Sequence, residues 1–169
     1  VVYFSNKTDV IGILAIADKI KSTSAAAIEA LQKKRIDVYM LTGDNEQTAK
    51  AVSSQVGLAH YKSEMLPSNK ADFIKQLQAQ GKVVAMVGDG INDSQALAQA
   101  DISIAMGKGS DIAMDVAKMT LITSDLMFIP KALNLSTKTI RTIKENLFWA
   151  FIYNLIGNPI AAGILYPVN

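Results

Sequence analysis

Met86-Val-Gly-Asp-Gly-Ile-Asn-Asp93 is the segment that decides how the fold is interpreted. An apolar run leads into it, two glycines flank Asp89, and a second carboxylate follows at Asp93. This pattern is typical of a buried strand that ends in a sharp turn and presents a carboxylate at the edge of a sheet. Ligands of an open parallel sheet bind beyond the carboxyl ends of its strands. The segment therefore predicts a polar site at Asp89 and Asp93.

Around this segment, short apolar runs alternate with amphipathic stretches. The alternation predicts an α/β fold with a Rossmann-like parallel sheet flanked by helices. The strand at 10–17 is apolar almost throughout, as expected for a strand buried on both faces. The other expected strands are 38–41, 82–87, 101–106 and 119–122, and the expected helices are 24–34, 45–56, 67–80, 92–99 and 110–117.

Composition excludes several classes of function. Half of the 169 residues are apolar, and 17 basic residues balance 15 acidic ones to a net charge of +2. This balance, without a basic run interleaved with aromatic residues, argues against nucleic acid as a partner. The absence of cysteine excludes disulfides and thiolate metal sites within the chain. His60 alone cannot build a zinc site and is interpreted as a polar loop residue.

From Asp125 onward the pattern changes to a long helical stretch, and residues 147–165 contain no charge. A stretch of this length suits a bilayer core of about 30 Å. Basic residues precede it and aromatic residues flank it, so we expect a transmembrane helix with its basic side in the cytoplasm. A buried core helix is the alternative. Asn154 inside the stretch indicates either a membrane pathway or helix–helix packing.

Further polar groups fall at or near the ends of predicted strands. Asp18 follows the first strand, Thr42-Gly43-Asp44 follows the second, and Lys70 opens a helix. Magnesium takes oxygen ligands, so Asp89 is suited to direct ligation and Asp93 to orienting metal-bound water or Lys70. The Thr42 hydroxyl, the Gly43 amide and Lys70 suit phosphoryl oxygens. The set resembles a phosphoryl-transfer site without its nucleophile.

Each of these groups also has a structural interpretation. Asp44 with Gln47, and Asn92 with Gln95, fit capping boxes at helix N-termini. Lys70 lies in the first turn of a helix, where a cation opposes the helix dipole, which indicates a nearby anion; a solvated surface lysine is the alternative. The dinucleotide fingerprint and the Walker lysine motif are both absent.

Thr42-Gly-Asp-Asn45, Lys70 and Gly88-Asp-Gly-Ile-Asn-Asp93, in this order, resemble the haloacid dehalogenase superfamily. More narrowly, they resemble the phosphorylation domain of P-type ATPases. The segment Asn146-Leu-Phe-Trp-Ala-Phe-Ile-Tyr-Asn154 is similar to a membrane helix of the cuprous-ion exporters among these pumps. The resemblance covers essentially the whole chain.

The resemblance implies a pump that ATP phosphorylates on an aspartate, with Mg²⁺ and ATP as cofactors. It implies catalytic roles for Thr42, Gly43, Asp44, Lys70, Asn92 and Asp93, and magnesium ligation by Asp89 and Asp93. It also places Asp18 and Lys21 near the nucleotide and makes Tyr153 and Asn154 ligands of the transported ion. Gln95 stands where the family usually has proline, and we expect little functional change from it.

The resemblance also implies an organisation. Residues 1–8 would end a nucleotide-binding domain, 9–124 would form the phosphorylation domain, 125–146 a juxtamembrane helix and 147–165 a transmembrane helix. The acceptor motif Asp-Lys-Thr-Gly-Thr is absent from the chain, so we expect the chain alone to be inactive toward ATP.

The expected function is that of part of an ATP-driven heavy-metal exporter with cuprous ion as its cargo. The expected partners are ATP, copper, the remainder of the pump and membrane lipid, with residues 1–146 in the cytoplasm. The alternatives are a truncated soluble phosphatase of the same superfamily and a non-catalytic binding or regulatory domain.

Overall fold

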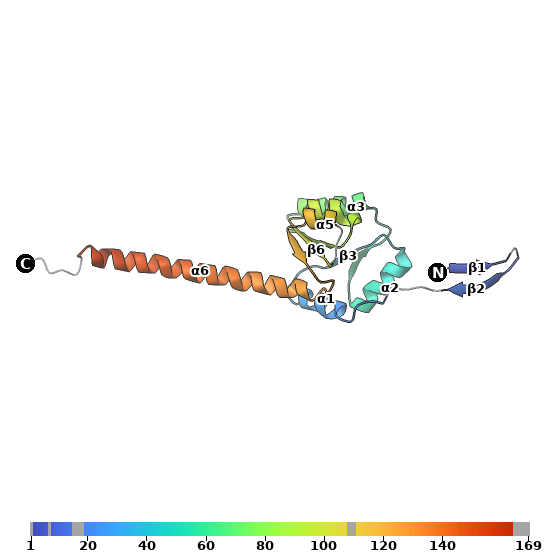
Figure 1. The fold of residues 1–169 in the computed structure, drawn as a ribbon, viewed down its shortest axis with the longest axis horizontal. Coiled ribbons are helices and arrows are strands. Elements are labelled where there is room, and N and C mark those ends of the chain that lie inside the picture. Colours follow the sequence, from blue (N-terminus) through green and yellow to red (C-terminus); the bar gives the residue numbers. More distant parts are fainter. Residues whose placement is uncertain (1, 7, 15–18, 108–110, 164–169) are drawn as a thin grey trace, which may run out of the picture. The chain divides into compact units, whose positions relative to one another are not determined.

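The computed structural model describes residues 2–6, 8–14, 19–107 and 111–163 (Figure 1). The chain divides into two compact units, residues 1–126 and 127–169. The elements are β1 (Val2–Ser5), β2 (Val10–Leu14), α1 (Ser24–Gln32), β3 (Tyr39–Leu41), α2 (Glu46–Val56), β4 (His60–Lys62), α3 (Pro67–Ala79), β5 (Ala85–Gly88), a 3-10 turn at Ile91–Asp93, α4 (Ser94–Gln99), β6 (Ile102–Met106), α5 (Asp111–Val116), β7 (Met119–Leu121) and α6 (Phe128–Ala161).

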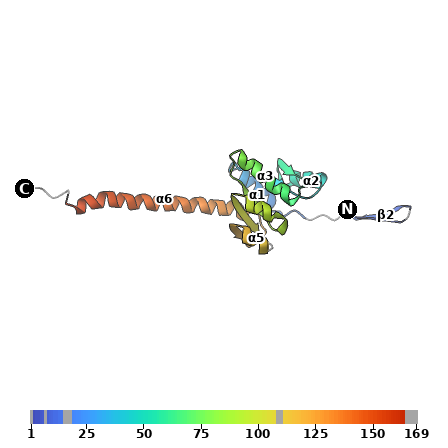
Figure 2. The same cartoon turned by 90° about the horizontal axis from the view of Figure 1, so that it is seen from above.

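Parallel strands form the centre of the first unit. β3 pairs with β4, and β5, β6 and β7 pair in that order, with every one of these pairings parallel. In Figure 1, α3 and α5 lie on one side of the strands, and α1 and α2 lie on the other. Figure 2 shows α2 and α5 at opposite ends of the strand layer. The predicted α/β fold with parallel strands flanked by helices is therefore confirmed.

The core lies where α3 and α4 pack on the strands. Its buried members are Ile74, Met86, Ala96, Leu97 and Ala100, and Leu41, Val84 and Val116 pack against them. Burying a large aliphatic side chain contributes about 1.5–3 kcal/mol, so this cluster supplies much of the stability of the unit. Leu41 belongs to β3 and Met86 to β5, so one core supports both sets of strands.

The helix ends follow local rules. Asn45 is the N-cap of α2, where its side-chain oxygen accepts a hydrogen bond from the Thr48 amide at 2.9 Å. Gly57 ends the helix with φ +73°, a conformation that glycine adopts without steric cost. The prediction that Asp44 and Gln47 form a capping box is therefore wrong, because the helix begins one residue later.

The second predicted capping box, Asn92 with Gln95, is also wrong. Residues 91–93 form a 3-10 turn, and α4 begins only at Ser94. The N-cap position falls on Asp93, whose side chain makes no capping hydrogen bond. The Asp93 carboxylate therefore does not cap α4.

Residues 10–14 do not join the parallel sheet as predicted for the strand at 10–17. β2 pairs antiparallel with β1, and Val10 and Ile11 are 59% and 72% exposed. The Asn6 amide donates a hydrogen bond to the Asp9 carbonyl at 2.8 Å and closes the turn between the strands. An apolar run occurs both in buried parallel strands and in hairpins, so the hydrophobic pattern alone led to the wrong pairing partner for this strand. Residues 15–18 lie outside the described part of the chain.

His60 is not a loop residue, since it begins β4. Its ring stacks on the ring of Tyr39 with centroids 4.9 Å apart, and Tyr39 meets Phe73 edge-on at 5.5 Å. A strand of three residues is too short to show an alternating pattern, which is why the sequence does not reveal it.

α6 is one continuous helix across the boundary that we expected at residue 146. None of the helices in the described ranges combines the length and the apolar character that a membrane crossing needs, so the transmembrane helix predicted at 147–165 is not confirmed. Residues 164 and 165 of that prediction lie outside the described ranges. Two features of α6 account for the difference. Asn154 and Asn158 interrupt the apolar segment, and the helix ends at Ala161, before the predicted end.

A polar cluster joins the starts of β5 and β6, at the edge opposite the predicted site. The Asp101 carboxylate accepts a hydrogen bond from the Val84 amide at 2.8 Å, and the Lys118 ammonium donates to the Asp101 carbonyl at 2.9 Å. The Val84 amide, followed by the Gln78 side chain, holds the pKa of Asp101 below its usual value. The ionised form of Asp101 is therefore favoured by folding.

We predict that Asp101 makes the domain sensitive to acid. A carboxyl group whose pKa is lower in the folded chain stabilises the fold above its unfolded pKa of about 3.9, and this stabilisation is lost as the pH falls through the folded pKa. Asp101→Asn should therefore be less stable than the wild type at pH 7 and should lose less stability as the pH falls below about 4. Urea unfolding at a series of pH values measures this. The control is Asp72→Asn, which removes an exposed carboxylate paired with Lys75 on the same helix. Parallel pH curves for the wild type and Asp101→Asn would contradict the prediction.

Candidate functional site

The predicted site residues lie at the carboxyl ends of two strands. Thr42, Gly43 and Asp44 directly follow β3, and Asp89 directly follows β5. α3 brings Lys70 to the same edge, and the 3-10 turn after β5 brings Asp93. Because parallel strands end at a common edge, residues far apart in sequence meet there.

Lys70 and Asp93 form an ion pair. The Lys70 Nζ atom lies 2.8 Å from Asp93 Oδ1, and the two side chains are only 12% and 15% exposed. The structure thus supplies an anion beside a cation in the first turn of α3, and it excludes the alternative of a solvated surface lysine. A charge pair in this environment is screened much less than a surface pair, and losing one partner leaves an uncompensated charge.

Gly88 allows Asp93 to approach the strand. A Cβ atom on Gly88 would lie 2.7 Å from Asp93 Cβ and 2.8 Å from Asp93 Oδ2. Such distances are far inside van der Waals contact, so only glycine fits at this position. The Asp93 amide also donates to the Gly90 carbonyl at 3.2 Å. The last residue of β5 therefore forms the surface on which the Asp93 side chain rests.

The loop after β3 is held by hydrogen bonds from within and from outside. The Thr42 hydroxyl donates to Asp44 Oδ2 at 2.9 Å and accepts from the Asp44 amide at 3.1 Å. From the β4–α3 loop, the Met65 amide donates to the Thr42 carbonyl at 3.0 Å, and the Glu64 amide donates to the Asp44 carbonyl at 2.8 Å. Glu64 adopts φ +52°, a strained conformation for a residue with a side chain.

Glu46 is a positioning residue that the sequence reasoning missed. Its carboxylate accepts hydrogen bonds from the hydroxyls of Ser63 and Tyr61, and these bonds, with that from Ser63 foremost, hold the pKa of Glu46 below its usual value. The contacts tie the start of α2 to the loop that supports Thr42. The signal in the sequence is an acidic residue in the first turn of a helix, which by itself indicates only a dipole interaction.

Asp89 and Asn92 are exposed at the same edge. No described residue forms a hydrogen bond or an ion pair with the Asp89 carboxylate, so it is available to a ligand. Within the described ranges, no three His, Asp or Glu side chains are arranged to hold a metal ion. A cation at Asp89 would therefore take most of its oxygen ligands from water and substrate, which is usual for magnesium.

The remaining predicted residues lie elsewhere or are not described. Asp18 falls outside the described part of the chain. The Lys21 ammonium donates to the Ser124 carbonyl at 2.8 Å. Tyr153 and Asn154 lie on α6 in the second unit, where both are exposed and Tyr153 is 78% exposed.

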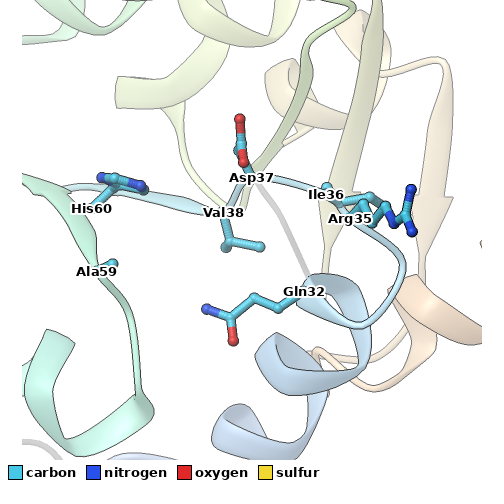
Figure 3. A pocket seen from close by; sticks show the side chains of 7 residues that line it. All are labelled: Gln32, Arg35, Ile36, Asp37, Val38, Ala59 and His60. Carbon is cyan, nitrogen blue, oxygen red and sulfur yellow. The ribbon is translucent and has the colours of Figure 1, made fainter.

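A small cavity of about 170 Å³ lies at the opposite edge of the strands (Figure 3). Its lining residues include Asp37 and Val38, which precede β3, and His60 at the start of β4. Figure 3 shows Gln32 and Val38 extending toward each other while the Arg35 side chain extends away. Charged groups therefore do not converge on the cavity, and it shares no residue with the site at the carboxyl edge. The lining residues are Gln32, Arg35, Ile36, Asp37, Val38, Ala59 and His60.

Comparison with known proteins agrees with this geometry. Residues 1–101 match the family of haloacid dehalogenase-like hydrolases. Over 171 residues, the chain is 52% identical to a probable copper-importing P-type ATPase A of Enterococcus hirae, covering 99% of this chain and 24% of that protein. It is also 52% identical, over 157 residues, to a copper-exporting P-type ATPase of Staphylococcus saprophyticus, covering 92% of this chain and 20% of that one.

A solved structure shows the same fold. It is that of a zinc-transporting PIB-type ATPase in the E2.Pi state, with a TM-score of 0.78 and 34% sequence identity, covering 89% of this chain and 26% of that chain. The chain thus spans about a quarter of the length of the proteins it matches. The family match, the parallel strands and the polar groups at their carboxyl ends show that this chain belongs to the haloacid dehalogenase-like hydrolases, among which it is similar to P-type ATPases.

Proposed function

We propose that this chain is part of the phosphorylation domain of an ATP-driven heavy-metal pump whose cargo is cuprous ion. The observation that carries the proposal is the shielded Lys70–Asp93 pair, held against Gly88 beside an available Asp89 carboxylate. The names of the relatives support copper, although one is named as importing and one as exporting. We propose export, the direction implied by the likeness of residues 146–154 to the exporters.

The donor set at this edge fits magnesium and a phosphoryl group. Asp89 would ligate the ion directly, and Asp93, supported by Asn92, would hold it from the following turn. When bound, Mg²⁺ neutralises charge on the transferring phosphoryl group. Lys70 adds a second positive charge at the same edge, and the Gly43 amide offers a neutral hydrogen-bond donor.

Asp44 positions the Thr42 hydroxyl. In the structure this hydroxyl donates to the Asp44 carboxylate, so its hydrogen is already directed by a neighbour. To bind a phosphoryl oxygen, the hydroxyl would turn its hydrogen from Asp44 to the phosphoryl group. The hydrogen bond from the Asp44 amide to the Thr42 oxygen can persist during this exchange. Asp44 would thus prepare a donor without contacting the phosphoryl group itself.

The acceptor aspartate would come from a strand between β3 and β5. Within the described sheets, β3 pairs with β4 and β5 pairs with β6, and they do not pair with each other. Both strands rest on one core, through Leu41 and Met86. An ion pair of 3.2 Å between Lys82 and Asp37 also links the segments that precede them. A parallel strand inserted there would end between Thr42 and Asp89.

The domain limits are proposed with one adjustment. Because β1 and β2 pair with each other, we assign the whole hairpin through Leu14 to the end of a nucleotide-binding domain. Residues 15–124 would form the phosphorylation domain on the cytoplasmic side of a membrane pump. Asp18 and Lys21 would lie near ATP, and Tyr153 and Asn154 would contact the cuprous ion.

The second unit would contact the rest of the pump. Exposed apolar side chains on α6 include Trp149, Phe151 and Leu155. We propose that the other helices of the pump and membrane lipid cover them. A free-standing phosphatase of the same superfamily is not favoured, because the relatives that match nearly the whole chain are ATPases.

Gly88→Ala tests the packing that positions Asp93. The added methyl group would overlap the Asp93 side chain, so we expect a loss of about 1–3 kcal/mol in the free energy of unfolding. Urea unfolding of the 169-residue chain measures this. Gly43→Ala is the matched control, because its Cβ would meet the Met65 carbonyl oxygen at an ordinary 3.6 Å. Equal stability of the two variants would show that Gly88 is not needed for this contact.

Asp89→Asn tests the proposed chemistry in the complete pump. We expect the rate of phosphoenzyme formation from MgATP to fall by at least about 100-fold, because a bound metal ion supplies several kcal/mol of charge stabilisation. The readout is acid-stable, hydroxylamine-sensitive incorporation of labelled phosphate. Asp72→Asn, at an exposed position on α3, should retain the wild-type rate. If Asp89→Asn also retained it, Asp89 would have no part in binding the metal.

A further inference from the structure

Two long-range hydrogen bonds join the segment before α1 to the segment before α6. The Thr23 hydroxyl donates to Asp125 Oδ1 at 2.8 Å, across 102 residues of sequence. The Lys21 ammonium donates to the Ser124 carbonyl at 2.8 Å, across 103 residues. Both bonds lie within the first unit, at the places where the chain leads into α1 and leads out toward α6.

The segment before α6 is also held by the residue that follows β6. The Gly107 amide, at the end of β6, donates to the carbonyls of Leu121 and Thr123 at 2.9 and 3.1 Å. Gly107 adopts φ +72°, a conformation that glycine reaches without the strain a side chain would cause. The Asp125 amide donates a hydrogen bond to the Thr123 hydroxyl at 3.2 Å, which closes a turn. The Asp125 carboxylate accepts the hydrogen bond from Thr23. The segment is thereby fixed between β6 and the start of α1.

The two bonds differ in strength. The Thr23–Asp125 bond is partly buried and has a charged acceptor, and charge-assisted hydrogen bonds are about twice as strong as neutral ones. The Lys21–Ser124 bond is exposed, and solvent weakens the contribution of an exposed lysine. Thr23 and Asp125 should therefore carry most of the connection, with Lys21 as an auxiliary.

We propose that the Thr23–Asp125 and Lys21–Ser124 bonds form a latch that couples the segment at 19–23 to the residues from which α6 departs. Residues 19–23 lead directly into α1, and Asp125 precedes α6 by three positions in sequence. A displacement of either segment strains the same two bonds, and the other segment then moves or the bonds break. This role rests on the proposed function: in the pump, the latch would transmit movement from the nucleotide-binding side to α6.

A latch predicts reciprocal effects that a local contact does not. Thr23→Val removes the hydroxyl and keeps the shape of the side chain. In the 169-residue chain, amide hydrogen exchange should then accelerate by roughly tenfold in both segments, 19–24 and 122–127, as expected for the loss of a hydrogen bond to a charged group. Asp125→Ala removes the acceptor and should accelerate exchange in the same two segments. The double variant should add little to Asp125→Ala, because the Thr23–Asp125 bond is absent in all three variants.

Two further variants serve as controls. Thr23→Ser keeps the hydroxyl and should restore slow exchange. Thr8→Val removes a similar hydrogen bond, from the Thr8 hydroxyl to the Asp9 carboxylate at 3.0 Å. Because that bond joins sequence neighbours in the hairpin, its loss should not change the exchange rate in either segment. Faster exchange confined to the segment that carries the mutation, or fully additive effects in the double variant, would overturn the latch.

The complete pump supplies a separate measurement. Thr23→Val should preserve phosphoenzyme formation from MgATP while lowering metal-stimulated turnover by several-fold, since the site remains intact and the transmission is weakened. Unchanged turnover would overturn the coupling. If the unmodified pump formed no phosphoenzyme, the proposed function would fail, and the exchange experiment would still decide whether the latch exists.

Discussion

The ion pair between Lys70 and Asp93 is the interaction on which the carboxyl edge of this domain depends. Lys70 comes from α3 and Asp93 from the turn after β5, and their 2.8 Å contact joins the two elements at the edge where the strands end. The pair is possible because Gly88 lets the Asp93 side chain lie directly against the strand. Because both side chains are largely shielded from water, each charge needs the other to compensate its loss of hydration. The positions of Lys70 and Asp93 are therefore fixed before a ligand binds.

The two edges of the strand layer have different roles. At the amino edge, Asp101 binds the amide that precedes β5 and stabilises the start of the strands. At the carboxyl edge, polar groups are either paired with one another or, like Asp89, left available to a ligand. The same division separates the small cavity near His60 from the site, since the cavity lies at the amino edge. The Asp101 contacts and the candidate site thus lie at opposite ends of the same strands.

Much of the fold and part of the site could be predicted from the sequence. The polar groups after β3 and β5 were predictable because an apolar run followed by glycine and aspartate is a local pattern. The hairpin of β1 and β2 was not predictable, since an apolar run does not reveal its pairing partner. The contacts of Glu46 with Ser63, and of Thr23 with Asp125, join distant residues and leave no periodic signal. The capping predictions failed because a shift of one residue changes which side chain faces a helix end.

In the proposed function, β3 and β5 flank the position of the strand that carries the acceptor aspartate. The most direct measurement adds a synthetic peptide, an apolar run ending in Asp-Lys-Thr-Gly-Thr, to the 169-residue chain and follows amide hydrogen exchange. We predict slower exchange in both β3 and β5 and no change in β7, because the added parallel strand would bond to the edges of β3 and β5 that pair with no other described strand. Slower exchange in only one of these strands, or in neither, would contradict it.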